Sequence, residues 1–152
     1  MRRIISVLME NEPGALSRIV GLFSQRGYNV DSLCVATTID PSLSRVTITT
    51  HGDEKVIEQI TKQINKLVDV FKVIDLTEGE HLERELMLLK VATPNENVRA
   101  EVKRNVDIFR AQIVDVSSKT YTIQATGSSE KLDAFLNAMA DYTDLIEASR
   151  TG

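Results

Sequence analysis

The sequence predicts an α+β fold of two tandem ferredoxin-like βαββαβ units, each an antiparallel sheet with its helices on one face. Two observations support this prediction. The order strand, helix, strand, strand, helix, strand occurs twice along the 152 residues. The segment THGDEKV at 50–56 also aligns without gaps on TGSSEKL at 126–132, and each joins a third predicted strand to a second predicted helix.

A polar, glycine-containing stretch at 77–80 separates the two halves and is typical of a linker. With 42% hydrophobic residues, the chain can bury a core in each half. We therefore predict one domain over residues 1–77 and a second over residues 78–152.

The elements of the first half follow from their hydrophobic periods. Alternation at every second residue predicts strands, and apolar residues at three- and four-residue spacing predict helices. Gly27 ends the first helix, and Gly52 with Asp53 begins the second. The predicted ranges are strand 4–9, helix 15–26, strands 28–36 and 43–50, a helix from 53 with apolar residues up to 67, and strand 70–76.

The second half repeats these patterns. Its helices carry apolar residues on one face, which we expect to cover the sheet. Each unit leaves either its other sheet face or an edge strand in need of cover. A homodimer that joins two sheets edge to edge would satisfy the exposed strand groups and bury apolar area. The predicted ranges are strand 85–91, helix 96–109, strands 112–116 and 120–126, helix 129–139 and strand 145–148.

The loop NEPGAL at 11–16 is the strongest candidate for a binding site. A predicted strand stops there and a helix begins at Gly14, which has no side chain to shield the main-chain N–H groups. These groups lack partners inside the helix and the helix dipole adds positive charge, so a carboxylate or phosphate is favoured. The alternative is that Asn11 caps the helix and nothing binds. Residues 93–95, TPN, contain no glycine, so only the first half is expected to bind a ligand.

A free amino acid bound at this loop also needs acceptors for its ammonium group, because an unpaired buried charge costs on the order of 2 to 5 kcal/mol. Asn29 and the carbonyl groups around Val30 can supply them. Within one unit these residues lie at the far end of the first helix, so a site that uses both ends must lie between two copies of the chain. The alternative is that Asn29 is a turn residue that bonds its own backbone.

Two longer motifs resemble the ACT-domain signature of the acetolactate synthase (acetohydroxyacid synthase) small-subunit family. They are NEPGALSR at 11–18 and FSQRGYNVDSL at 23–33. The similarity continues over nearly the whole chain in shorter segments: SR at 44–45, GDEK at 52–55, KLVDV at 66–70, ERELML at 83–88, DIFRA at 107–111 and KLDAF at 131–135.

The resemblance implies an N-terminal ACT domain that binds valine at a homodimer interface, followed by a C-terminal ACT-like domain. It also implies a regulatory subunit of branched-chain amino-acid biosynthesis, which activates a large catalytic subunit and confers feedback inhibition by valine. No cofactor is expected in this chain, because thiamine diphosphate, Mg²⁺ and FAD belong to the catalytic partner. The family's binding positions match Asn11, Gly14, Ala15, Leu16, Asn29 and Val30.

Composition argues against several other functions. The net charge is -4 with acidic and basic residues interspersed, so we expect no nucleic-acid partner, and no run of eighteen apolar residues predicts a membrane span. The single cysteine, Cys34, suits a reducing cytoplasm and is expected in the core. His51 and His81 show no metal-ligand spacing, and no nucleophile-base motif occurs, so we expect no catalysis by this chain. A free-standing ACT-type amino-acid sensor is the alternative function.

Overall fold

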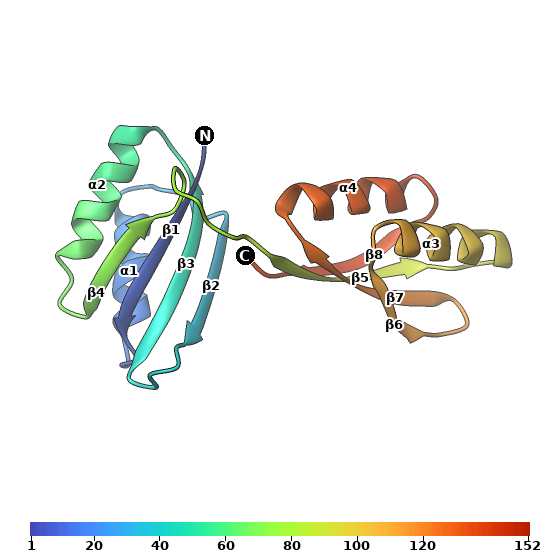
Figure 1. The fold of residues 1–152 in the computed structure, drawn as a ribbon, viewed down its shortest axis with the longest axis horizontal. Helices are drawn as coiled ribbons and strands as arrows, with labels where there is room; N and C mark the ends of the chain where they lie inside the picture. Colours follow the sequence, from blue (N-terminus) through green and yellow to red (C-terminus); the bar gives the residue numbers. More distant parts are fainter. The chain divides into compact units, whose positions relative to one another are not determined.

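The computed structural model describes residues 1–152. It contains two compact units, an N-terminal unit, Met1–His81, and a C-terminal unit, Leu82–Thr151. Each unit is a four-stranded antiparallel sheet with two helices on one face (Figure 1). The strand order β2-β3-β1-β4 of the first unit recurs as β6-β7-β5-β8 in the second. The predicted fold of two tandem ferredoxin-like units is therefore confirmed.

The elements of the N-terminal unit lie close to their predicted positions, with one exception. The strand predicted over 28–36 starts only at Ser32, because the amide of Tyr28 bonds the carbonyl of Phe23 and so closes the preceding helix. The elements are β1 (Arg2–Glu10), α1 (Ala15–Gln25), β2 (Ser32–Thr37), β3 (Leu43–His51), α2 (Glu54–Asn65) and β4 (Val70–Asp75).

The C-terminal unit also follows the predicted order. The ungapped alignment of residues 50–56 on residues 126–132 pairs Asp53 with Ser129. The structure instead places Asp53 and Ser128 at equivalent N-caps, so the alignment is offset by one residue in the helices. The elements are β5 (Glu85–Ala92), α3 (Glu96–Ile108), β6 (Gln112–Val116), β7 (Thr120–Gly127), α4 (Ser129–Ala140) and β8 (Leu145–Arg150).

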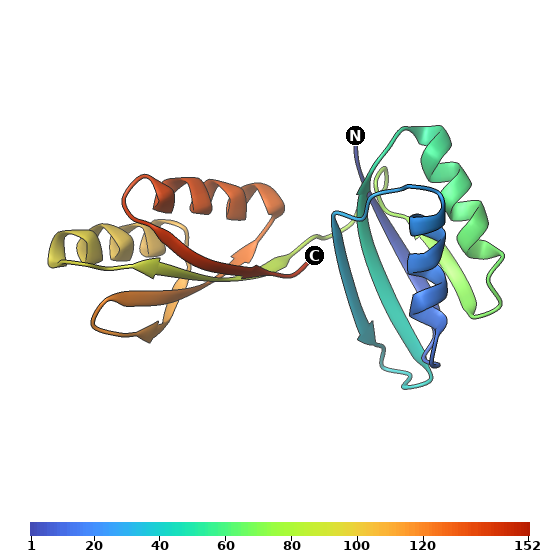
Figure 2. The same cartoon turned by 180° about the vertical axis from the view of Figure 1, so that it is seen from behind.

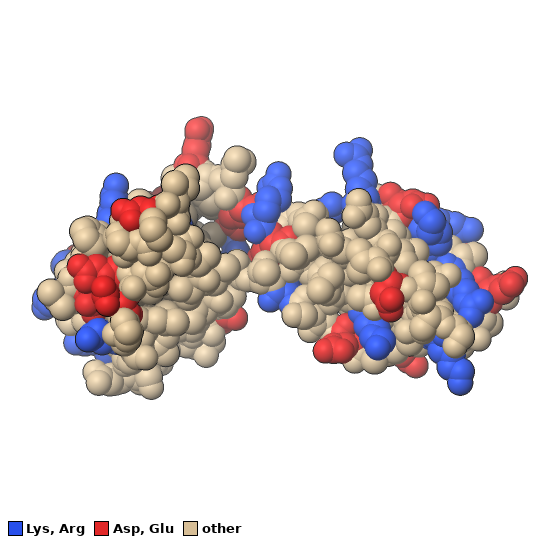
Figure 3. Space-filling view, turned by 90° about the horizontal axis from the view of Figure 1, so that it is seen from below, with Lys and Arg blue, Asp and Glu red and all other residues tan.

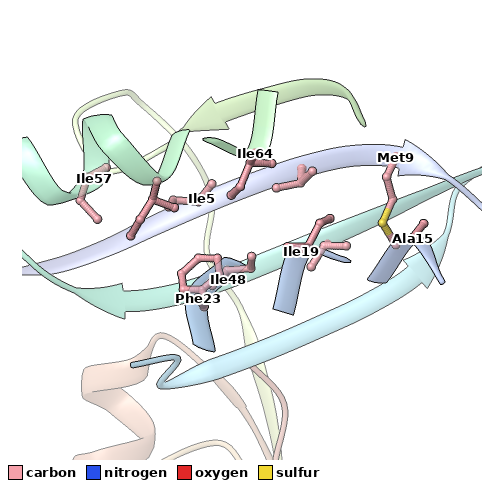
Figure 4. Close-up of a cluster of buried hydrophobic side chains, with 11 residues drawn as sticks. Ile5, Met9, Ala15, Ile19, Phe23, Ile48, Ile57 and Ile64 are labelled. Atoms are coloured by element: carbon pink, nitrogen blue, oxygen red, sulfur yellow. The ribbon is translucent and has the colours of Figure 1, made fainter. Parts of the chain in front are cut away.

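Each unit has its own hydrophobic core between the sheet and its helices. In the N-terminal unit, cross-strand neighbours such as Ile5 and Ile48 face the helices, and Figure 4 shows Ile19 and Phe23 of α1 over them. In the C-terminal unit, Phe109 and Phe135 meet edge to face, with ring centroids 5.2 Å apart. The apolar stripes predicted for the helices are therefore the ones that are buried.

Cys34 does not lie in the core, contrary to the prediction. It is half-exposed on β2, where its cross-strand partner is Thr47. The core residues Val46 and Ile48 point to the other face of the sheet, because adjacent strand residues alternate between faces.

Charged side chains are interspersed on the face of each unit drawn in Figure 3, and no continuous basic stripe is visible there. No group of His, Cys, Asp and Glu side chains is arranged to hold a metal ion. No helix has both the length and the apolar composition that crossing a membrane requires.

Candidate functional site

Helix α1 differs from the other three helices at its N-terminus. Side chains of Asp53, Asn95 and Ser128 cap α2, α3 and α4 by accepting a hydrogen bond from a main-chain amide. The N-cap of α1 is Gly14, with φ 87° and ψ -13°, and no side chain caps the helix. This left-handed conformation suits glycine and leaves the helix start open.

The hydrogen bonds around this helix start leave several donors free. The amide of Ala15 donates to the carbonyl of Glu12 at 3.3 Å, and that of Arg18 to the carbonyl of Gly14 at 3.1 Å. The amides of Leu16 and Ser17, which lie between them, have no acceptor in the protein. Two adjacent N–H groups at the positive end of a helix dipole form a site for an anionic group.

Asn11 does not cap α1, so the alternative interpretation of this residue is wrong. Its side-chain Nδ2 donates to the carbonyl of Pro41 at 3.1 Å, and its main-chain N–H donates to the carbonyl of Ser42 at 2.8 Å. Asn11 therefore fixes the loop against the turn between β2 and β3. That turn has hydrogen bonds of its own, since the amide and the hydroxyl of Ser42 donate to Oδ1 of Asp40 at 3.0 and 2.7 Å. These bonds hold the pKa of the Asp40 carboxyl below its ordinary value.

Asn29 and Val30 follow the C-terminal end of α1, and the loop at 11–16 precedes its N-terminal end. Figure 2 shows the connections to this helix, drawn in blue, at its two opposite ends. The helix between them has 11 residues and therefore spans about 16 Å. The side chain of Asn29 donates to Asp31 Oδ1 at 2.9 Å, and the carbonyl of Val30 accepts no hydrogen bond from the protein. One copy of the unit thus brings Asn11, Gly14, Ala15 and Leu16 together but not Asn29 and Val30.

Comparison with known families and proteins shows the family of this chain. Residues 5–72 match the model described as "AHAS small subunit-like ACT domain", and residues 84–152 match "Small subunit of acetolactate synthase". The acetolactate synthase isozyme 3 small subunit of Salmonella typhimurium is 59% identical over 152 residues, which cover 100% of this chain and 93% of the relative. This chain belongs to the acetolactate synthase small-subunit family.

Other members of the small-subunit family agree with this assignment. The acetolactate synthase small subunit of Haemophilus influenzae is 59% identical, with 100% of this chain and 93% of the relative covered. The crystal structure of the small subunit from Thermotoga maritima superposes with a TM-score of 0.83 at 36% identity, over 100% of this chain and 94% of that chain. Small subunits of this family are the regulatory subunits of acetolactate synthase, and catalysis lies in the large subunit.

Two charged residues beside the loop at 11–16 were not predicted from the sequence. Nη1 of Arg18 lies 2.6 Å from Oδ2 of Asp69, and the same Nη1 lies 3.5 Å from the position that a Cβ on Gly14 would occupy. Arg18 could have been found, because it follows Gly14 by four residues and so lies one helical turn away on the same face. Asp69 carries no such signal, since only the fold brings it to the helix.

Proposed function

We propose that this protein is a valine-sensing regulatory subunit that binds L-valine at the start of α1 and thereby inhibits the large subunit that it otherwise activates. The observation that carries the proposal is the uncapped helix start, where the amides of Leu16 and Ser17 have no acceptor. A valine carboxylate bound there would accept both hydrogen bonds and would interact favourably with the helix dipole. Gly14 would let it approach the main chain closely.

The ammonium group of valine would be held by a second copy of the chain. The free carbonyl of Val30 and the side chain of Asn29 provide acceptors. One copy cannot supply both ends of the site, because the length of α1 separates them. We therefore propose that Asn11, Gly14, Ala15 and Leu16 of one copy and Asn29 and Val30 of its partner form the effector site.

The edge strand β2 favours such a homodimer. β2 pairs only with β3, so its other edge has free hydrogen-bonding groups. Leu33 and Val35 on this strand are 39% and 38% exposed, although their cross-strand neighbours belong to the core. Joining two β2 edges would pair the free groups and bury these apolar side chains.

Inhibition requires that valine bind more tightly when the large subunit is in its less active state. The coupling is reciprocal, and in comparable systems it amounts to about 1–3 kcal/mol. The chemistry would belong to the partner, which uses thiamine diphosphate, Mg²⁺ and FAD to join pyruvate to a second 2-oxoacid. We place the assembly in the cytoplasm, where the free thiol of Cys34 suits a reducing environment.

Co-purification with the large subunit, followed by an acetolactate assay with and without L-valine, tests this proposal. Addition of the chain should raise the activity of the large subunit, and valine should lower the activity of the complex but not that of the large subunit alone. A complex that ignores saturating valine would contradict the proposal. A chain that binds valine without affecting the large subunit would instead be a free-standing amino-acid sensor.

A further inference from the structure

The N-terminal unit has a hollow at the opposite end of β1 from the loop at 11–16. It lies beside α2 and the end of β4 and has a volume of about 370 Å³, which suffices for a small ligand. The charged residues that line it are Arg3, Glu54, Glu58, Lys62, Asp75 and Glu78.

Arg3 is an incompletely paired buried cation in this hollow. The residue is 6% exposed, and its Nε has no hydrogen-bond partner. Its Nη1 is 3.5 Å from Oε1 of Glu78, at the outer limit of a hydrogen bond, and the side chain of Glu78 is 75% exposed. A buried guanidinium normally has all its donors satisfied, so Arg3 has capacity for a further acceptor.

The equivalent corner of the C-terminal unit is closed by a network of bonds. Nε of Arg150 lies 2.5 Å from Glu85, and Nη1 lies 2.6 Å from Asp133. Nη2 lies 3.0 Å from the hydroxyl of Ser129. The guanidinium of Arg150 therefore fills the space between the first strand, the last strand and the second helix of that unit.

The four equivalent positions in the N-terminal unit hold one arginine and three carboxylates, and the arginine forms no hydrogen bond or ion pair with these carboxylates. The strand registers place Asp75 where Arg150 stands, opposite Ile5 and Met87 respectively, and place Arg3 where Glu85 stands. The helix starts place Glu54 and Glu58 at the positions of Ser129 and Asp133. No hydrogen bond or ion pair joins Arg3 to Asp75 or to either glutamate, so the corner that is filled in one unit stays open in the other.

The charges around the hollow indicate what it can bind. Glu58 is paired with Lys62 at 2.6 Å, which leaves Arg3 as the cation and Glu54, Asp75 and Glu78 as carboxylates. A simple anion would suit Arg3 but would be repelled by the carboxylates, and a simple cation would be repelled by Arg3. A ligand with both charges satisfies both groups.

We propose that this hollow binds a small α-amino acid as a zwitterion, with its carboxylate on Arg3 and its ammonium group on Asp75 and Glu54. The site is separate from the loop at 11–16 and does not depend on valine binding there. Its apolar lining is limited to residues such as Ile57, so the side chain of the ligand must be small.

Titration of the ¹⁵N-labelled protein with L-alanine, observed by NMR, tests the proposal. Propionate and ethylamine serve as half-ligands, because each lacks one of the two charged groups. The titration is carried out in the Gly14→Asp background, in which the loop at 11–16 is blocked. Saturable shifts are expected at amides of residues 54–58 and 75–78 with L-alanine, and neither half-ligand should saturate in the same range.

Two variants and one control assign the contacts. Arg3→Gln should weaken L-alanine binding by about tenfold or more, and Asp75→Asn, an exposed position that leaves the core intact, should weaken it similarly. Arg2→Gln makes the same change on the opposite face of β1 and should leave the affinity unchanged. Circular dichroism establishes that each variant is folded.

The outcomes separate this site from the valine site. Shifts that saturate only outside residues 54–58 and 75–78, or an affinity unaffected by both Arg3→Gln and Asp75→Asn, would overturn the proposal. Neither result bears on the loop at 11–16, which is blocked in this background. Propionate binding as tightly as L-alanine would also overturn it, because the hollow would then be a plain anion site. Absence of shifts with L-alanine, L-serine and L-threonine, each up to its solubility limit, would show that no small zwitterion binds.

Discussion

Arg18 and Asp69 form an ion pair of 2.6 Å beside the uncapped start of helix α1. The side chain of Asp69 is 13% exposed, whereas that of Arg18 is 51% exposed, so the carboxylate is the more buried partner. The guanidinium lies next to Gly14, where it adds positive charge to that of the helix dipole, and the carboxylate of Asp69 offsets part of that charge.

Substitutions in this ion pair should change valine affinity in opposite directions. Arg18→Met removes a cation next to the proposed carboxylate site and should weaken valine binding two- to fivefold, the effect of about 0.5–1 kcal/mol for a half-exposed pair. Asp69→Asn removes a competing anion and should strengthen binding over the same range. Isothermal calorimetry measures both, and Arg104→Met in the C-terminal unit is the control. Changes in the same direction would contradict this role of the pair.

Gly14→Asp should give a complex that is active but insensitive to valine. The substitution places a carboxylate where the effector's own carboxylate would lie, so binding is lost through repulsion. Gly14→Ala adds only a Cβ at φ 87° and should cost about 1–2 kcal/mol of stability while retaining weakened binding. Gly21→Asp, in the same helix where a Cβ would meet nothing within 4 Å, is the matched control. Unchanged valine affinity in Gly14→Asp would rule out the loop as the site.

Arg110→Gly should stabilise the C-terminal unit. Arg110 has φ 54° after the end of α3, and the equivalent residue after α1 is Gly27, with φ 68°. Left-handed backbone costs a non-glycine residue about 1–2 kcal/mol, so the free energy of unfolding should rise by about 1 kcal/mol. Urea denaturation measures the change, and the reverse substitution Gly27→Arg should lower the stability of the N-terminal unit. A less stable Arg110→Gly protein would show that the arginine side chain contributes more than the conformation costs.

Arg150→Met should destabilise the C-terminal unit by about 2–3 kcal/mol, because it leaves the 12%-exposed side chain of Glu85 without this partner. Burial lowers the pKa of Arg150, but bonds to Asp133 and Glu85 outweigh this and raise it above its ordinary value. Because the pKa of this basic group is raised in the folded state, the stabilisation that it provides is lost only as pH rises through that pKa. The destabilisation caused by Arg150→Met should therefore be constant across neutral pH. Arg104→Met, which removes an exposed pair with Glu101, should cost less than about 0.5 kcal/mol. Equal effects of the two substitutions in denaturant titrations would contradict the assigned network.

Much of the fold was predictable from local signals. Gly27 and Asp53 mark helix ends through their own backbone or side-chain chemistry, and the helical apolar stripes match the buried residues. The start of β2 was predicted too early, because the sequence does not show that the amide of Tyr28 closes α1. Cys34 was misplaced because a hydrophobic edge strand does not reveal which of its faces is covered.

The candidate site was only partly predictable. Gly14 marks the open helix start in the sequence, since few other residues accept its backbone conformation. The bond of Asn11 to the turn at 40–42 and the bond of Arg18 to Asp69 depend on residues far apart in the chain. The hollow at Arg3 likewise needed the fold, because its lining comes from β1, α2 and the end of β4, which are far apart in the chain.

A crystal structure of the protein grown with L-valine is the decisive measurement. The valine carboxylate should lie within hydrogen-bond distance of the main-chain nitrogens of Leu16 and Ser17 of one copy. Its ammonium group should lie against Asn29 and the carbonyl of Val30 of a second copy. Valine bound within a single copy, or bound elsewhere while the loop at 11–16 stays empty, would contradict the proposed site.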